Sequence, residues 1–270
     1  MPLDILQMPP LTCPDTSGVS TVQSRGTLVF CHGAWHDAAC WLPTMMPYFS
    51  KIGFHCLAPS YRNHGKSHKQ GALKFRRISE YVADVQSVVS ELGGQRVCLI
   101  GHSMGGLVVQ KFLEQYPDRI DKAVLLSSVP PHGAWRATLK NAVHYPLSFL
   151  KANATLSLYP FIDTPEKFRK HFYTEGVAEG DLQQLFAQAQ DESFAAFLDM
   201  LILNLPKPSK IKTPIMVIGG GKDYIFSKSD ILKTAKAYNT TALIFENEAH
   251  NLFLEQNWEA AAAQMAAFLG

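Results

Sequence analysis

The chain contains 270 residues, of which 47% are hydrophobic and 18% are charged, and its formal net charge is +2 with neutral histidine. This composition is ordinary for a soluble globular protein, and so small a charge gives no indication of nucleic acid or of a membrane surface as a partner. No stretch approaches the roughly 20 apolar residues that a membrane-spanning helix needs. A nucleic-acid-binding protein and a membrane span are therefore excluded, and a small-molecule partner is expected.

The N-terminus and the cysteines indicate the compartment. The opening "MPLDILQMPPLTCP" has an early acid, several prolines and no basic start, which is not typical of a signal peptide. The five cysteines form no C-x-x-C pair, and several lie in apolar, strand-like surroundings. They are Cys13, Cys31, Cys40, Cys56 and Cys98. Reduced, buried thiols are expected at such positions, so we predict a cytoplasmic protein that is a monomer or a homodimer.

Short apolar runs alternate along the chain with longer helical patterns. The runs lack clean polar alternation, which is typical of strands buried on both faces of a parallel sheet. They span residues 26–33, 53–60, 95–103, 122–128, 213–221 and 241–248. Apolar residues at helical spacing, or an alanine-rich helical composition, mark residues 78–92, 107–116 and 258–269. This alternation predicts an α/β fold with a doubly wound, mostly parallel sheet.

Residues 129–210 interrupt this alternation. They contain seven prolines and short amphipathic helical pieces, and none of them is typical of a strand. Such an insertion predicts a helical cap, or lid, over one end of the sheet, after the sixth strand. The sequence thus divides into a core of residues 1–128 and 211–270 and a cap of residues 129–210.

The segment "GHSMG" at 101–105 lies between a predicted strand and a predicted helix. The pattern G-x-S-x-G in this setting indicates a sharp, strained turn that exposes the serine hydroxyl. Glycines two residues to either side are needed because a β-carbon there would clash with a neighbouring strand or helix. The alternative is a glycine-rich turn with an incidental serine, but the flanking elements favour Ser103 as a nucleophile.

A serine hydroxyl becomes nucleophilic when a base takes its proton, and the base needs an orienting acid. In this architecture the order along the chain is serine, acid, histidine, each after a successive strand. Asp223 and His250 follow the last two predicted strands and fit that order. Three carboxylates nearby remain alternatives for the acid, namely Asp230, Glu246 and Glu248. Asp230 at a helix start is more typical of a helix cap, and both glutamates precede the histidine.

Two backbone N–H groups are expected to form an oxyanion hole. One belongs to Met104, at the N-terminus of the helix that follows the nucleophile, where the helix dipole favours an anion. The other belongs to Ala34, in the loop after the strand at 26–33, where Gly33 lets the backbone turn closely. We expect His32 to brace this loop rather than to act as a second base.

The substrate pocket is less well defined by the sequence. Residues that flank the catalytic loops are expected to line it, and Trp135 is the first candidate from the cap. The flanking candidates are Gly33, Trp35, Leu252 and Phe253, of which Trp35 and Phe253 are equally typical of core aromatics. An apolar pocket of this kind suits a short or medium acyl or aryl ester.

These motifs resemble those of the α/β-hydrolase superfamily. The resemblance rests on His32-Gly33, "GHSMG" at 101–105, Gly221-Lys222-Asp223 and Ala249-His250-Asn251. The loop "SYRNHGKS" at 60–67 is similar to the family's D-x-R-G-H-G-x-S, with departures at Tyr61 and Asn63. A serine at position 103 separates the chain from the dehalogenases and epoxide hydrolases of that superfamily, which use aspartate.

The stretch from His32 to Trp41 is similar to the opening motif of plant methylesterases and hydroxynitrile lyases. The resemblance implies that the lyases carry threonine where this chain has Gly33 and lysine where it has Asn251. We therefore predict a serine hydrolase that cleaves a small or medium carboxylic ester or lactone through an acyl-enzyme, without a cofactor or a metal. The alternatives are a receptor-like relative with slow turnover and a lyase, and a cofactor-free peroxidase activity is a possible side reaction.

Overall fold

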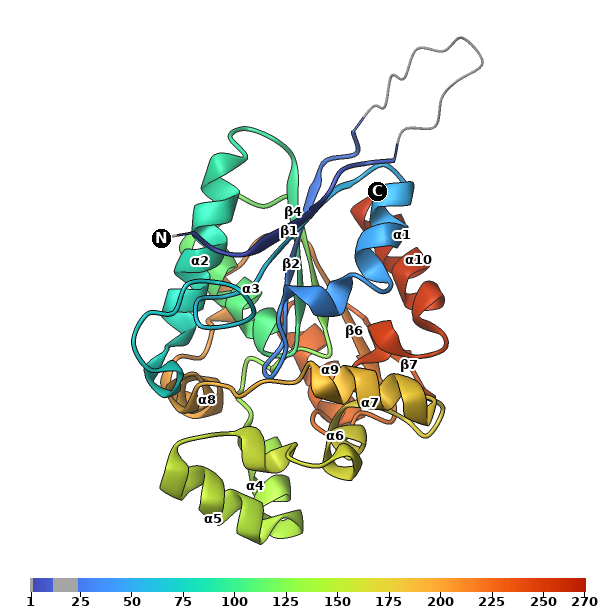
Figure 1. The fold of residues 1–270 in the computed structure, drawn as a ribbon. Helices are drawn as coiled ribbons and strands as arrows, with labels where there is room; N and C mark the ends of the chain where they lie inside the picture. Colours follow the sequence, from blue (N-terminus) through green and yellow to red (C-terminus); the bar gives the residue numbers. More distant parts are fainter. Residues whose placement is uncertain (1, 12–23) are drawn as a thin grey trace.

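The computed structural model describes residues 2–11 and 24–270, so Cys13 lies outside the described residues. Within them, seven strands form one sheet in the order β1-β3-β2-β4-β5-β6-β7 (Figure 1). The strands are β1 (Ile5–Met8), β2 (Thr27–Cys31), β3 (His55–Pro59), β4 (Val97–His102), β5 (Lys122–Leu126), β6 (Ile215–Gly220) and β7 (Ala242–Phe245). All neighbouring pairs are parallel except β1 and β3, which confirms the mostly parallel sheet.

The strand β1 was not anticipated from the sequence. It lies at the edge of the sheet, pairs antiparallel with β3 and is only partly buried, so it lacks the continuous apolar run of the central strands. By contrast, every residue of β2 and β4 is buried. Since β1 is the one strand ahead of β2 in the described residues, the helical insertion follows the fifth strand in chain order rather than the sixth.

Helices cover both faces of the sheet, as a doubly wound fold requires. The helices are α1 (Met45–Lys51), α2 (Ile78–Glu91), α3 (Met104–Gln115), α9 (Lys228–Ala237) and α10 (Trp258–Leu269). Apolar residues of α2, α3 and α9 form one hydrophobic core with the sheet, and those of α1 and α10 form a second core on the opposite face. Figure 1 shows α1 and α10 on the side of the sheet away from α2. The four described cysteines are buried and form no disulfide with one another.

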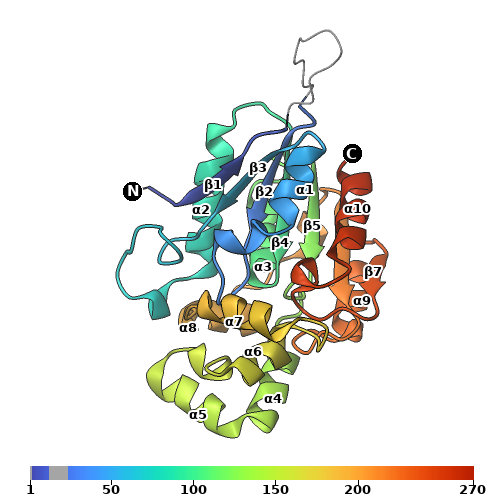
Figure 2. The same cartoon turned by 45° about the vertical axis from the view of Figure 1, so that its right-hand side comes forward.

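Between β5 and β6 the chain forms the segment that we call the cap, residues 129–210. It contains no named strand and consists of helices and short turns. The helices are α4 (Trp135–His144), α5 (Pro146–Thr155), α6 (Pro165–Phe172), α7 (Glu179–Ala187) and α8 (Phe194–Leu198). Figures 1 and 2 show the cap at one end of the sheet, with α4 and α5 farthest from the strands.

Two buried carboxylates join the end of the cap to the core. Glu192 accepts a hydrogen bond from Tyr81 Oη at 3.1 Å, and its Oε2 lies 3.0 Å from Nε2 of the fully buried His64. Asp199 accepts from the guanidinium of Arg77 and from the backbone N–H of Ile78. Both carboxylates are buried in this arrangement, and each would lose its compensating partner if the cap shifted, so these contacts fix the orientation of the cap.

Candidate active site

Ser103 lies in the turn between β4 and α3 with a strained backbone. Its φ is 53° and its ψ is −118°, a region that residues with a side chain rarely adopt. A β-carbon at Gly101 would lie 2.5 Å from the carbonyl oxygen of Gly105, and one at Gly105 would lie 2.2 Å from that of Cys31. The expectation that only glycine fits two residues to either side is confirmed, because α3 and β2 approach the turn this closely.

His250 and Asp223 form a buried pair at the ends of β7 and β6. His250 Nδ1 lies 2.8 Å from Asp223 Oδ2, and both side chains are fully buried. The other carboxylate oxygen, Oδ1, accepts the backbone N–H groups of Ile225 at 2.7 Å and Phe226 at 3.0 Å. With Nδ1 donating its proton to the carboxylate, Nε2 of His250 carries the lone pair that a general base needs.

The loop that carries His250 is joined directly to the serine turn. His102, which precedes Ser103, donates from Nε2 to the carbonyl oxygen of His250 at 3.2 Å. Burial and the neighbouring histidines lower the pKa of His102 far below its ordinary value, so this ring is a neutral, structural group. His250 Nε2 is buried and has no hydrogen-bond partner among the described residues, Ser103 Oγ included. Catalytic hydrogen bonds are often long in a free enzyme and tighten when substrate binds.

None of the three alternative carboxylates contacts His250. Asp230 forms a capping box with Ser227 at the start of α9; burial opposes its ionisation, but its hydrogen bonds to Ser227 and His132 outweigh this and lower its pKa. Glu246 is exposed and pairs with Lys228, and Glu248 accepts from Asn257. The structure therefore brings Asp223, and not its neighbours in the sequence, to the histidine.

The loop after β2 approaches the serine turn from the other side. The backbone N–H groups of Ala34 and Met104 donate to no other described residue, and the Ala34 side chain borders the same cavity as Ser103. His32 is fully buried, and its Nε2 accepts the N–H of Tyr61 at 3.2 Å. Burial lowers the pKa of His32 well below its ordinary value, so the ring braces the loop as a neutral group, as the sequence indicated.

A second histidine in this loop was missed by the sequence reasoning. His36 donates from Nδ1 to the carbonyl oxygen of Ala34 at 2.7 Å, while its Nε2 accepts from Nδ2 of Asn251 at 3.1 Å. The same amide nitrogen also donates to Tyr173 Oη at 2.8 Å. Asn251 follows His250, so these contacts link the loop after β2, the loop that carries His250 and the cap.

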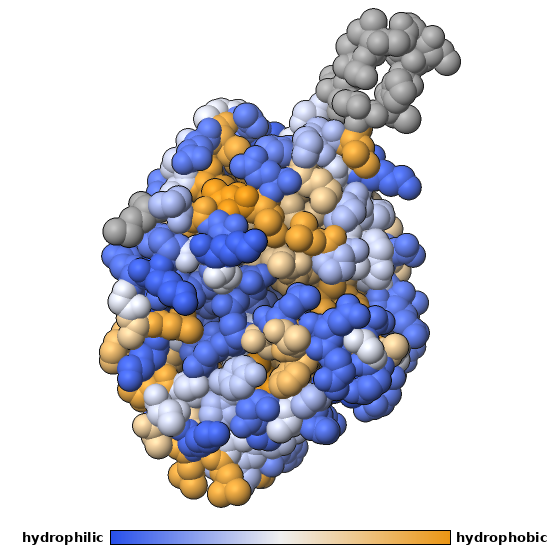
Figure 3. Space-filling view, in the orientation of Figure 1, coloured by the Kyte–Doolittle hydropathy of each residue, from blue (hydrophilic) through white to orange (hydrophobic). Residues whose placement is uncertain are grey.

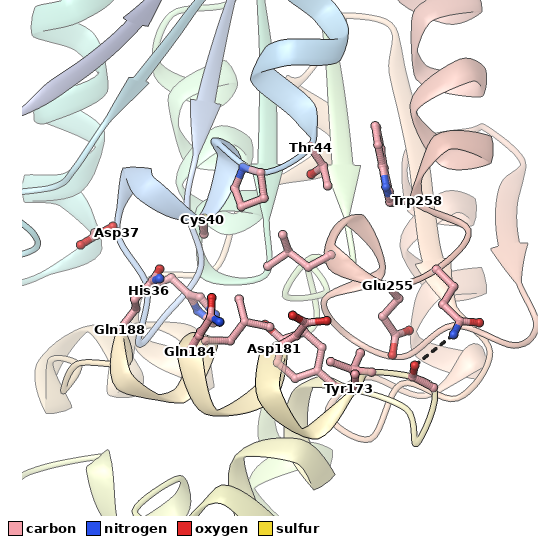
Figure 4. Close-up of a pocket in the computed structure, with 17 residues that line it drawn as sticks. His36, Asp37, Cys40, Thr44, Tyr173, Asp181, Gln184, Gln188, Glu255 and Trp258 are labelled. Carbon is pink, nitrogen blue, oxygen red and sulfur yellow. Dashed lines mark hydrogen bonds between the residues drawn. The ribbon is translucent and has the colours of Figure 1, made fainter.

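His36 also borders a groove of about 500 Å³ (Figure 4). Ser103 is not among the residues that line it. In the close-up, α7 of the cap forms one wall with Asp181, Gln184 and Gln188, and Glu255 and Trp258 form another. None of the predicted catalytic residues borders it. Among the described residues, no group of three histidine, cysteine, aspartate or glutamate side chains is arranged to hold a metal ion.

The cavity at Ser103 is small and mostly apolar, with a volume of about 70 Å³. The core supplies Ala34, Trp35, Ile225 and Phe226, Val129 lies where the cap begins, and the rest of the cap covers them. The cap residues are Ala134, Ala137, Thr138, Asn141, Leu158, Phe161, His171, Phe197 and Met200. Of the predicted pocket residues, only Trp35 borders this cavity.

The other four predicted pocket residues do not border this cavity. Gly33 packs against the turn so closely that a β-carbon would lie 2.7 Å from His102 Nδ1. Leu252 and Phe253 are fully buried in the core beneath the sheet, where Phe253 stacks on Trp41. Trp135 lies on the outer face of α4 and is 45% exposed, so it faces solvent rather than Ser103.

Two polar residues of the cavity had no signal in the sequence. His171 lies with Nε2 2.8 Å from Asn141 Oδ1 and with Nδ1 2.7 Å from the carbonyl oxygen of Lys167. Burial lowers the pKa of His171 to about 4, so near pH 7 the ring is neutral and donates a hydrogen bond to only one of these two oxygens. The two side chains come from α6 and α4, 30 residues apart, and meet only because the cap helices pack together.

Comparison with known proteins agrees with this architecture. A family model described as the alpha/beta hydrolase fold matches residues 26–156. A bifunctional esterase/perhydrolase from Acinetobacter calcoaceticus is 36% identical over 105 residues, which cover 38% of this chain and 37% of that protein. A non-heme chloroperoxidase from Burkholderia pyrrocinia is 28% identical over 258 residues, or 90% of this chain and 91% of the relative.

Among solved structures, an esterase from Exiguobacterium antarcticum superposes with a TM-score of 0.76 at 16% identity, covering 99% of this chain and 95% of that one. The match to the Acinetobacter calcoaceticus relative thus spans little more than a third of that protein's length. The structural similarity to the Exiguobacterium antarcticum esterase extends over nearly the whole chain.

Proposed function

Because the chain is a member of the α/β-hydrolase superfamily, we propose that it is a serine hydrolase that cleaves small carboxylic esters through an acyl-enzyme. The observation that carries this proposal is the conjunction of a strained Ser103 with a buried Asp223–His250 pair joined to the same turn. An isolated buried carboxylate–imidazole pair is a common structural feature. Here the pair lies next to a serine held at positive φ, so the three residues can act as nucleophile, base and orienting acid.

The proposed reaction has two halves. Ser103 Oγ attacks the acyl carbon while His250 Nε2 takes the hydroxyl proton, and Asp223 stabilises the imidazolium that forms. The N–H groups of Ala34 and Met104 stabilise the negative oxygen of the tetrahedral intermediate. The alcohol leaves with the proton from His250 and the serine stays acylated. Water then gives a proton to His250 and attacks the acyl carbon, and the bond from the acyl carbon to Ser103 Oγ breaks as His250 returns the proton to that oxygen, which releases the carboxylic acid and free Ser103.

The cavity supports a small acyl group. Its volume of about 70 Å³ is well below the roughly 300–1,000 Å³ of sites for drug-sized ligands. None of its bordering residues is lysine or arginine, and its histidine is neutral, so a strongly anionic substrate has no counter-charge. We therefore narrow the predicted small or medium ester to a short acyl chain, and the same site suits a small lactone.

The lyase alternative is disfavoured by two contacts. A β-carbon at position 33 would meet His102 Nδ1 at 2.7 Å, so this loop has no room for the threonine of the lyases. Asn251 is fully buried and directs its amide nitrogen to His36 and Tyr173, and no cationic side chain borders the cavity. A leaving cyanide would therefore lack a stabilising charge.

A second candidate activity uses the same acyl-enzyme. One relative is named an esterase/perhydrolase and another a chloroperoxidase, and both names fit a site in which hydrogen peroxide replaces water as the second nucleophile. The peroxide would attack the acyl carbon and leave as a peracid, with its proton taken by His250. Bromide oxidation that requires both acetate and hydrogen peroxide, and that is absent in Ser103→Ala, would support this candidate.

A panel of p-nitrophenyl esters of graded chain length, beside a set of lactones and with Ser103→Ala as the blank, tests the proposal. We expect multiple turnovers with a preference for the shortest acyl chains. A single turnover per molecule would favour the receptor-like alternative. A preference for long chains would contradict the assignment of the cavity as the acyl site.

A further inference from the structure

The cap exposes large apolar side chains on α4 and α5. Trp135, Leu139 and Val143 recur every four residues along one face of α4 and are 45%, 60% and 68% exposed. Leu147 and Leu150 on α5 are 81% and 66% exposed. These five are nearly half of the eleven large hydrophobic side chains exposed among the described residues. Figure 3 shows hydrophobic surface at the end of the molecule where Figure 1 places α4 and α5.

The same two helices carry only positive charge. From Trp135 to Thr155 the chain contains Arg136, Lys140 and Lys151 and no aspartate or glutamate. Arg136 is exposed with its guanidinium 5.1 Å from the centre of the Trp135 ring. Lys151 is 63% exposed and lies 3.8 Å from Asp163, whereas Lys140 is turned inward onto the carbonyl oxygen of Tyr224. The exposed apolar face is therefore bordered by one cation without a carboxylate partner among the described residues, Arg136, and by Lys151, whose charge Asp163 partly offsets.

The exposed apolar face and the cations beside it together indicate the kind of partner that binds there. A helix with tryptophan and leucine on one face and lysine or arginine beside them binds the interface of an anionic bilayer, where apolar side chains enter the acyl boundary and cations meet the headgroups. We propose that the α4–α5 face of the cap docks on an anionic lipid surface. Docking a second copy on this face is disfavoured, because a two-fold contact would bring two faces together that carry the exposed Arg136 and no acidic residue of α4 or α5 to pair with it.

The docking face also lies next to the cavity. Trp135, Leu139 and Val143 border a shallow outer groove of about 420 Å³, and Ala137 and Ile225 border both this groove and the cavity at Ser103. One layer of side chains thus separates the lipid-facing groove from the serine. Docking does not depend on the proposed hydrolysis, and binding is measured without any substrate.

Flotation of the purified protein with phosphatidylcholine vesicles, with and without phosphatidylglycerol, tests the proposal. We expect binding to the vesicles that contain phosphatidylglycerol, weakened by high salt because exposed charges are then screened. Leu139→Ser and Leu147→Ser should each weaken binding about tenfold, and Arg136→Gln about fivefold. Phe75→Ser is the matched control, since Phe75 is 57% exposed on the core, outside the α4–α5 face, and should leave binding unchanged.

Three results would overturn the proposal. The first is no binding to the phosphatidylglycerol vesicles by a wild-type protein whose melting curve is cooperative. The second is an equal loss of binding in Phe75→Ser and Leu147→Ser. The third is a wild-type dimer in sedimentation velocity that Leu147→Ser dissociates, without vesicle binding, which would assign the face to a second copy.

Discussion

The inner face of α4 borders the candidate active site, whereas its outer face belongs to the proposed docking surface. The inner face presents Ala137, Thr138 and Asn141 to the cavity at Ser103, whereas the outer face exposes Trp135 and larger aliphatic side chains. An amphipathic helix normally buries its large apolar residues. In α4 the small residues point inward, so space remains beside the serine, and the large residues are left for a partner. A ten-residue helix thus forms the roof of one site and the contact face of another.

The largest effect should come from the serine beneath the inner face. We expect Ser103→Ala to lower kcat for p-nitrophenyl acetate by about 10⁴-fold or more, because the nucleophile is lost. Ser127→Ala is the matched control, since Ser127 is also buried at positive φ and its hydroxyl has no hydrogen-bond partner among the described residues. Comparable losses of kcat in both variants would mean that removing a buried hydroxyl at this end of the sheet, and not removing the nucleophile, is responsible.

The next largest effect should come from the acid. Asp223→Asn should lower kcat by about 10²–10⁴-fold, because the imidazolium of His250 loses its stabilising carboxylate. Asp230→Asn, which weakens the capping box of α9 and the contact with His132, should lower the melting temperature and leave kcat nearly unchanged. The opposite pattern, measured by steady-state kinetics and thermal melting, would assign the acid to Asp230.

The comparison of the two faces is tested most sharply by a pair of variants on α4. Ala137→Leu fills the cavity and should change the ratio of kcat/KM between acetate and butyrate esters by about 10–200-fold. Trp135→Ala should leave that ratio within about twofold, because its side chain faces solvent. A change of chain-length preference in Trp135→Ala would restore the pocket role that the sequence suggested.

The smallest effect concerns the orientation of the cap. Burial disfavours the charged form of His64, but Glu192 and the Arg62 carbonyl oxygen outweigh it and raise the pKa of His64 above its ordinary value near 6.5. The stabilising contribution of His64 is therefore complete below about pH 6.5 and is lost as the pH rises through the raised pKa. His64→Gln should lower the melting temperature by a few degrees at low pH, and by less as the pH rises. A difference that is independent of pH would contradict an imidazolium at this position.

The sequence predicted the core of the site because its signals are local. The turn around Ser103 is specified within five residues, and the order of strands places Asp223 and His250 at the same end of a parallel sheet. The partly exposed strand β1 has no comparable pattern, so it was missed. The sequence of the short turn after His250 does not show which way its side chains point. Leu252 and Phe253 were expected in the pocket, but they pack into the core.

The cap was the least predictable part for a physical reason. Trp135 was expected inside because large apolar residues are usually buried, and only the packing of α4 shows that it faces outward. The meeting of Asn141 and His171 depends on tertiary contacts alone. The sequence contains the excess of basic residues in α4 and α5, but the net charge of +2 describes the whole chain and does not show this local excess.

Labelling with a fluorophosphonate probe, followed by peptide mapping, tests the central claim most directly. The probe reacts with a serine that a base has activated and does not depend on knowing the substrate. We predict one adduct per chain, located on Ser103, absent in Ser103→Ala and formed more slowly in Asp223→Asn. An adduct on another serine, or equal labelling of Ser103→Ala, would contradict the account.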